Sequence, residues 1–197
     1  MKTFFFLLLF LSIQTTFAQK QDIKNLYFDY LQVRMDADEQ PEAITKALEL
    51  LNRKTELNKT QLGNVTYHLG RLYEETGDIE KAIPYYESSI KMTPGYYVPY
   101  RALGFYNFER SNSLLKKIND AILAKNNQLI ATLNKDYNIL ALKTIAYLEK
   151  SQACDPDDET KGMIINLYKN IKNDAAIGTL DTRLKKLSTD CITLLED

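Results

Sequence analysis

Few side chains in this sequence have the type and spacing that catalysis requires. His68 is the only histidine among 197 residues, and histidine is the commonest general base and metal ligand in proteins. It stands in a helical apolar pattern, where a lone histidine is usually a polar surface residue rather than a catalytic group. The sequence contains no HExxH, CxxC, glycine-rich phosphate loop or Ser-His-Asp pattern. We therefore expect no catalytic residue, no metal and no cofactor.

Four acidic residues surround Pro156, and calcium is the cation that such a cluster would suit. They are Asp155, Asp157, Asp158 and Glu159. The segment lacks the glycine and the ligand spacing of an EF-hand loop. Acidic residues also favour the first turn of a helix, because the N-terminal end of a helix carries partial positive charge. We therefore expect these residues to begin a helix rather than to bind a metal.

Cys154 and Cys191 are the only two cysteines. Their spacing is not that of a zinc site, and two cysteines are too few for a disulfide framework. Export of the chain would permit a disulfide between them. Two buried free thiols are the simpler expectation, and the sequence leaves the disulfide open.

The first 18 residues have the pattern of a secretory signal peptide. Lys2 precedes an apolar run over residues 4–13, which is about half the roughly twenty residues that span a bilayer. Small residues follow, and we predict cleavage between Ala18 and Gln19. An uncleaved N-terminal anchor is the alternative. The mature chain, residues 19–197, has no further apolar run of membrane length, so we expect it in the periplasm or outside the cell.

The mature chain is close to neutral. The whole sequence carries a formal net charge of -1, and loss of Lys2 leaves the remainder slightly more acidic. It therefore lacks the basic surface that nucleic acids or anionic lipids require. Glycine and proline are scarce, and apolar residues recur at intervals of three and four. This pattern predicts a single all-α domain.

The clearest helical pattern is "LGRLYEETGDIEKAIPYYESSIKMTP", residues 69–94. Gly77 and Asp78 separate two apolar stripes, because glycine accepts the left-handed conformation at a helix end and aspartate caps a following helix. Pro94 ends the second stripe. The segment therefore predicts two helices joined by a tight turn.

Small residues in this pair predict a close helix crossing. Gly70 and Ala82 lack bulk, so the two backbones can approach each other there. Tyr73 and Tyr86 are expected to fill the space around the crossing.

This segment resembles a tetratricopeptide repeat, whose unit of roughly 34 residues carries a Leu-Gly pair, a tyrosine, a Gly-Asp turn, an alanine, an aromatic residue and a closing proline. The matching positions are Leu69, Gly70, Tyr73, Gly77, Asp78, Ala82, Tyr86 and Pro94. Thr66 replaces the tryptophan of the family. The resemblance is specific over residues 63–104 and looser elsewhere. It implies an α-solenoid, a stack of antiparallel helix pairs.

The predicted solenoid has four units, at about 22–57, 63–96, 97–158 and 159–197. The third is too long, since its closing proline, Pro156, comes far later than a period of roughly 34 residues allows. Apolar stripes continue through the added length, with a polar break only at residues 124–128. We expect both helices to be extended by about fourteen residues, or roughly 21 Å, into a hairpin that stands out from the stack. An inserted short pair of helices is the alternative.

The fourth unit is expected to be atypical, because its outer face meets water. It begins with a first helix that carries Ile165 and Tyr168. A final helix is predicted through Leu180, Leu184, Leu187 and Leu194.

In tetratricopeptide repeat proteins the first helix of each unit lines a concave groove that holds peptides. The resemblance places eight groove candidates in the second and third units: Asn64, Tyr67, Arg71, Glu74, Val98, Arg101, Phe105 and Phe108. Arginine would pair with carboxylates, and aromatic faces would take apolar side chains. Alternatively, the aromatic residues pack against neighbouring helices and the arginines are solvated.

These observations predict a non-enzymatic scaffold or adaptor that binds a protein or peptide partner, through the groove, the hairpin or both. Two alternatives have their own requirements. A small-ligand-binding protein would need a cavity where the long hairpin meets the stack. An enzyme would need a catalytic motif, and none is present in the sequence.

Overall fold

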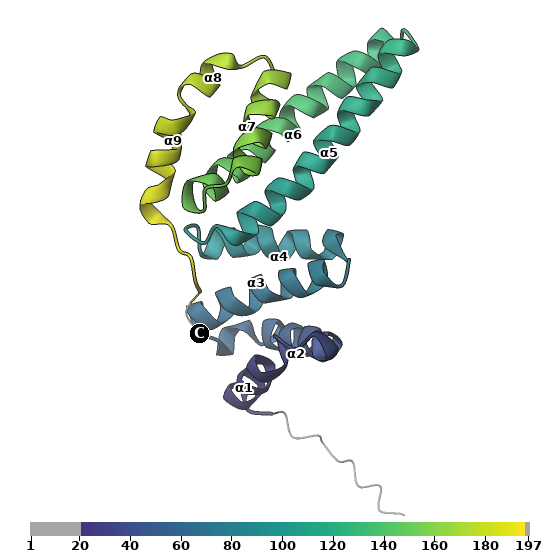
Figure 1. Cartoon of the computed structure of the whole chain (residues 1–197). Coiled ribbons are helices and arrows are strands. Elements are labelled where there is room, and N and C mark those ends of the chain that lie inside the picture. Colours follow the sequence, from purple (N-terminus) through teal and green to yellow (C-terminus); the bar gives the residue numbers. More distant parts are fainter. Residues whose placement is uncertain (1–20, 196–197) are drawn as a thin grey trace, which may run out of the picture.

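The computed structural model describes residues 21–195, and these residues form helices with one isolated backbone bridge. The helices are α1 (Ile23–Val33), α2 (Gln40–Asn52), α3 (Lys59–Glu75), α4 (Ile79–Met92), α5 (Val98–Leu123), α6 (Asn127–Cys154), α7 (Asp158–Asn170), α8 (Asp174–Gly178) and α9 (Leu180–Leu187). Helices α1 to α4 stack in layers, α5 and α6 rise from the stack as a long hairpin, and α7 to α9 pack beside it (Figure 1). The prediction of an all-α repeat fold is confirmed. The predicted signal peptide lies outside the described residues.

The turn between α3 and α4 forms at the predicted glycine. Gly77 adopts a φ of 82°, and the next amide, that of Asp78, donates to the carbonyl of Tyr73 at 2.7 Å. This arrangement satisfies carbonyl groups at the end of α3. The capping prediction for Asp78 is wrong, because its side chain makes no cap hydrogen bond. Its carboxylate instead lies 2.6 Å from the ammonium group of Lys81.

Small residues allow the close crossing of α3 and α4, as predicted. A Cβ atom at Gly70 would lie 2.9 Å from the ring of Tyr86, so this position has no room for a larger residue. Ala82 is fully buried in the same helix pair. The rings of Tyr73 and Tyr85 stack with centroids 5.7 Å apart beside the crossing.

The long hairpin is continuous, so the alternative of an inserted short pair is wrong. Helices α5 and α6 have 26 and 28 residues, against 17 and 14 in α3 and α4. The turn falls within the predicted polar break, where Lys125 adopts a φ of 54°. Ile118, Tyr137 and Ala141 are buried between the two helices, in a core that continues into α7 and α9.

The crossing of α5 and α6 depends on Gly104. A Cβ atom there would lie 2.5 Å from Cδ2 of Leu148, which has no exposed surface. We expect Gly104→Ala to lower the free energy of unfolding by about 1–2 kcal/mol, because overpacking outweighs the better helix propensity of alanine.

The matched control for this prediction is Gly162→Ala in α7, where a Cβ atom would meet nothing within 4 Å. For this variant we expect the free energy of unfolding to rise by about 0.5–1 kcal/mol, since only helix propensity changes. Urea unfolding of both variants measures the difference. Shifts of the same sign and size would contradict the packing explanation.

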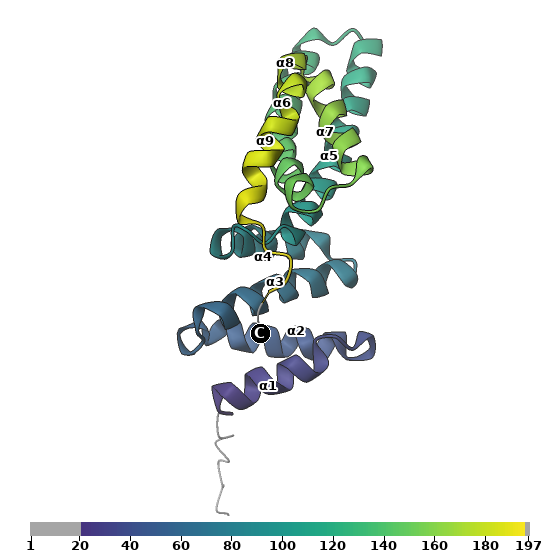
Figure 2. The ribbon, with the colours of Figure 1, turned by 60° about the vertical axis from the view of Figure 1, so that its left-hand side comes forward.

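The predicted final helix ends earlier than expected. Helix α9 stops at Leu187, a short 3-10 turn follows, and the chain is then extended. Leu194, predicted on the helix, is 80% exposed. The backbone amide of Ile192 donates to the carbonyl of Gly95 at 2.8 Å instead of continuing a helix. Both views show this last segment running beside α4 and the adjacent end of α3 (Figures 1 and 2).

Cys154 and Cys191 form a disulfide, with Cα atoms 5.4 Å apart. The expectation of two free thiols is therefore wrong. Cys154 is the last residue of α6, and α9 packs against α6 so that the chain passes this end as it leaves the helix. The meeting of the two cysteines results from helix packing, which their spacing in the sequence does not indicate.

Candidate peptide-binding surface

Two of the four groove candidates on α3 lie in the core. Asn64 is 1% exposed and Tyr67 is 5% exposed. The ring of Tyr67 packs edge-on against that of Tyr96, with centroids 4.8 Å apart. Burial raises the pKa of the Tyr67 hydroxyl. The structure therefore uses these residues to join α3 to the turn before α5.

The other two candidates on α3 lie at the surface, in separate hollows. Arg71 is half-buried and its Nε lies 2.8 Å from the carboxylate of Glu75. It lines a cavity of about 260 Å³ with residues of the α1–α2 connection. Glu74 accepts a hydrogen bond from the hydroxyl of Tyr86. Burial, together with this carboxylate, raises the pKa of Tyr86.

Arg101 of α5 is held by residues at the end of α6. Its Nη1 lies 2.9 Å from the carboxylate of Asp155, and its Nη2 reaches the main-chain oxygen of Asp155 and the carboxylate of Asp157. Its guanidinium group also lies over the ring of Tyr97, 5.3 Å from the centroid. Arg101 thus fixes α5 to the α6–α7 turn, and its hydrogen-bonding capacity is largely used within the chain.

The remaining α5 candidates contact apolar clusters. Phe105 and Phe108 are partly buried against the core that α5, α6 and α7 share. Val98 packs against the core of α3 and α4. All three residues contribute mainly to helix packing, which is the alternative that the sequence left open.

The acidic residues around Pro156 begin α7. The carboxylate of Asp157 accepts a hydrogen bond from the amide of Thr160 at 2.7 Å. Burial acts to raise the pKa of Asp157, but the hydrogen bonds from Thr160 and the charge of Arg101 outweigh it, and the pKa is lowered. Within residues 21–195, no three histidine, cysteine or acidic side chains gather as a metal site.

An acidic hollow remains open between the α3–α4 turn, α5 and α7. It has a volume of about 330 Å³ and includes the carboxylates of Glu74, Glu109 and Glu159. Phe105 and Met163 supply apolar surface in the same hollow. Two of the groove candidates, Glu74 and Phe105, therefore meet here. The arginines that the sequence placed in the groove do not line this hollow, so it suits a basic or apolar side chain rather than a carboxylate.

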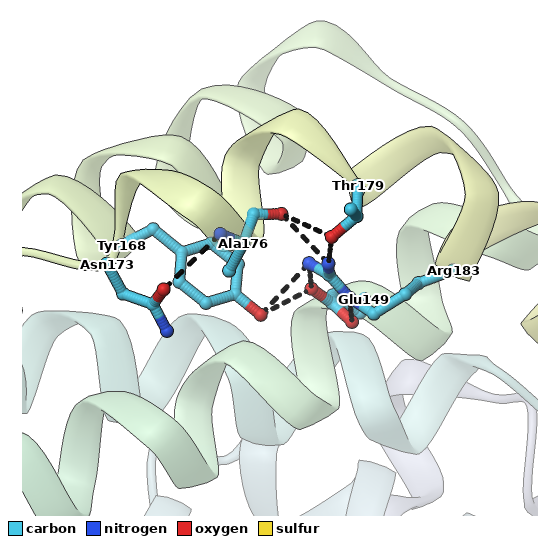
Figure 3. A network of polar contacts seen from close by, with 6 residues as sticks. All are labelled: Glu149, Tyr168, Asn173, Ala176, Thr179 and Arg183. Atoms are coloured by element: carbon cyan, nitrogen blue, oxygen red, sulfur yellow. Dashed lines mark hydrogen bonds and ion pairs between the residues drawn. The ribbon is translucent and has the colours of Figure 1, made fainter.

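A larger cavity of about 640 Å³ lies where the long hairpin meets the turn before α5 and α9. Four of its charged groups form two pairs: Glu149 lies 2.6 Å from Arg183, and Lys150 lies 2.6 Å from Asp190. Arg183 of α9 also donates to the carbonyl of Ala176 in α8. Its guanidinium group therefore connects α9 to both α6 and α8 (Figure 3). Sequence analysis did not find this network, because its members come from three separate helices.

Residues 65–96 match the tetratricopeptide repeat family. The chain therefore contains a tetratricopeptide repeat. The match covers most of α3, all of α4 and the turn at Gly77. Repeats of this kind generally act as protein-interaction scaffolds and are generally not enzymes. No curated protein and no solved structure matches the chain. Across residues 21–195, none of the helices has the length and the apolar character needed to cross a bilayer.

The single histidine of this repeat protein is half-buried, which differs from the surface position expected from sequence. Its ring packs beside that of Tyr67, with centroids 4.9 Å apart. Burial, with smaller effects from the charges of Arg34 and Arg71, lowers the pKa of His68 to about 3. The imidazole is therefore neutral in the folded repeat protein near pH 7.

His68 should make the stability of the repeat protein depend on pH. His68 has a pKa of about 6.5 in the unfolded chain and of about 3 in the folded chain. The free energy of unfolding is therefore highest above pH 6.5 and falls as the pH drops towards 3, because only the unfolded chain takes up a proton in this range. Between pH 7 and pH 5 we expect a loss of about 1–2 kcal/mol. Urea unfolding at both pH values measures it. His68→Gln should remove most of this loss, and an equal loss in the variant would contradict the assignment.

Proposed function

We propose that this tetratricopeptide repeat protein is a non-enzymatic scaffold that binds a partner protein, with the long hairpin as its principal contact. The observation that supports this most strongly is the apolar surface of the hairpin. Large apolar side chains of the hairpin are exposed to solvent: Ile122, Leu123 and Leu129 near its turn, and Ile139 and Leu142 further along α6. Leu123, beside the turn, is 82% exposed.

None of these side chains belongs to the apolar clusters of residues 21–195. The hairpin buries a different set, including Ile118, Tyr137 and Ala141, between its two helices and α7. Exposed apolar residues that gather on one element are typical of surfaces that contact another protein. A protruding hairpin also presents both of its helices to a partner, as a helix in the stack cannot. The acidic hollow at Glu74 offers a second contact for a basic or apolar side chain.

We also propose that the protein acts outside the cytoplasm, in the periplasm or beyond the cell. Two features support export: the signal-peptide pattern of residues 1–18 and the disulfide between Cys154 and Cys191. Disulfides form and persist mainly in oxidising compartments. Mass spectrometry of the protein recovered from envelope and medium fractions tests this. A mature chain that begins at Gln19 supports export, and an intact chain confined to the cytoplasm contradicts it.

The scaffold proposal is tested by capturing partners with the full chain as bait, with chemical crosslinking, from envelope and medium fractions. The hairpin variant Leu123→Asp/Ile139→Asp should capture at least ten-fold less of any partner that the wild-type chain enriches. Lys117→Asp, an exposed change on the same hairpin, is the matched control and should retain it. No enriched partner, or equal capture by all three baits, would contradict the proposal.

A second candidate is small-ligand binding in the cavity of about 640 Å³. The cavity lies where this hypothesis requires it, and Tyr100, Ala146 and Leu187 give it apolar walls. Four of its charged groups are already paired with one another, so a ligand would bind mainly by apolar contact. Native mass spectrometry of the purified protein should then show a bound small molecule that Ala146→Trp excludes. A protein without an adduct would contradict this function.

A further inference from the structure

The last described residues are bound to the stack, and the backbone is extended at Cys191 and Ile192 before it bends at residues 193 and 194. We call residues 191–195 the tail. The amide of Ile192 donates to the carbonyl of Gly95 at 2.8 Å, and Ile192 forms a parallel bridge with Tyr96. Within residues 21–195 this is the only strand-like pairing. The tail therefore binds as peptides bind to a sheet edge, by main-chain hydrogen bonding.

The surface under the tail includes predicted groove residues. We call it the edge surface; it consists of the first turns of α3, the end of α4 and the turn at residues 93–97. Leu195 packs against the cluster that contains Tyr67, Tyr96 and Val98. Asn64 lines a hollow together with Ile192 and Leu195. Asn64 therefore shares a hollow with the tail, and Tyr67 and Val98 belong to the apolar cluster against which Leu195 packs.

Gly95 is matched to the close approach of the chain at the end of the 3-10 turn Ser188–Asp190 and at Ile192. A Cβ atom there would collide with the main-chain oxygen of Asp190 and lie 3.1 Å from Cγ1 of Ile192. Gly77 is the only glycine of the described chain with a positive φ, so the conformation of Gly95 does not itself require glycine. The close approach of the second backbone explains the residue.

The tail fills the edge surface incompletely. A hollow of about 530 Å³ remains between the tail, α3 and the end of α4. Leu194, at the rim of this hollow, is largely exposed, and Ile192 is only partly covered, at 38% exposure. The surface therefore has room for bulkier side chains than those the tail supplies.

We propose that the edge surface binds an extended peptide segment of a partner protein and that the tail is its intramolecular occupant. The segment would pair in parallel with Tyr96 and place apolar side chains where Ile192 and Leu195 lie. This inference rests on the proposed scaffold function and names a second contact for it. The disulfide at Cys191 keeps the tail at an effective concentration in the millimolar range, about that of a short tether. A partner must therefore displace the tail.

Disulfide trapping on Cys154 measures binding at this surface. The opened chain is the full-length variant Cys191→Ser/Ile192→Asp/Leu195→Asp, whose tail can neither crosslink nor pack. Its probe is a peptide of residues 191–197 with the natural cysteine, mixed with the chain in a glutathione buffer; residues 188–190 of the chain itself stay in place. At equilibrium we expect at least ten-fold more trapping of this peptide than of one carrying Ile192→Asp and Leu195→Asp. Equal trapping of the two peptides would overturn the inference.

A second substitution separates binding from general accessibility of Cys154. Gly95→Ala in the opened chain should reduce trapping of the natural peptide at least five-fold, because the added methyl group would crowd the Ile192 side chain of the peptide. Gly162→Ala, remote from this surface and free of contacts, should leave trapping unchanged. Circular dichroism and thermal unfolding check that each variant is folded. Unchanged trapping in a folded Gly95→Ala chain would overturn the inference.

Partner capture distinguishes this inference from the scaffold proposal. The opened chain should capture at least ten-fold more partner than the wild-type chain, because no tail competes. Equal capture by the two chains would overturn the role of the tail and leave the scaffold function standing. Capture by neither chain would contradict the scaffold function, whereas the trapping experiment reports on the edge surface in either case.

Discussion

Replacing both cysteines with serine is expected to lower the free energy of unfolding by about 3–4 kcal/mol. The disulfide joins residues separated by 37 positions, and the loop that it closes contains α7, α8 and α9. A crosslink over a loop of this length restricts the unfolded chain strongly. The same bond holds the end of the chain beside α6, so its loss should also release residues 191–195.

Urea unfolding of the wild-type chain and of Cys154→Ser/Cys191→Ser measures this effect. Reduction should lower the stability of the wild-type chain to that of the variant and leave the variant unchanged. Hydrogen exchange should become fast at Ile192, whose amide is bonded to Gly95 in the intact protein. A change below about 1 kcal/mol would contradict the crosslink explanation.

The second large effect is expected at the ion pair between α6 and α9. Glu149 is buried and receives hydrogen bonds from Arg183 and from the hydroxyl of Tyr168 (Figure 3). Burial and the Glu149 carboxylate raise the pKa of Tyr168 to about 12, so this hydroxyl stays protonated and donates. Arg183→Met would leave the carboxylate buried without its cation. We expect the free energy of unfolding to fall by about 2–3 kcal/mol. This is at the lower end for a broken buried ion pair, because Arg183 is partly exposed.

A double variant tests the physical reason for this loss. Glu149→Met/Arg183→Met removes both charges, so it should be more stable than Arg183→Met alone. Lys161→Met is the control, since the pair of Lys161 with Asp181 is exposed and contributes little. Urea unfolding of the three variants gives the comparison. A double variant no more stable than Arg183→Met alone would contradict the buried-charge explanation.

Local features of the fold were predictable because each depends on a short stretch of sequence. Gly77 ends α3 because glycine reaches the left-handed conformation with no steric cost. Gly70 shows the close crossing of α3 and α4, since a small residue at a helical contact position indicates close backbones. The long hairpin follows from apolar periodicity that continues without a turn signal.

The candidate site was less predictable, because the partners of its residues lie far apart in the sequence. Family positions place Arg101 in a groove, but the carboxylate that it contacts belongs to Asp155, 54 residues away. Tyr67 stands at a position of its repeat unit that faces the groove in the family, yet the ring of Tyr96 packs against it.

The last segment shows the same division between sequence and structure. Its leucines have helical spacing, and this spacing alone predicts a continuous helix to Leu194. Packing of α9 against α6 instead brings Cys191 to Cys154 and Ile192 to Gly95. Periodicity within the chain determined which residues form helices and which faces they bury. Contacts between distant helices decided which charged and aromatic side chains remain available to a partner, because those contacts use hydrogen-bonding groups and apolar surface that the sequence shows as free.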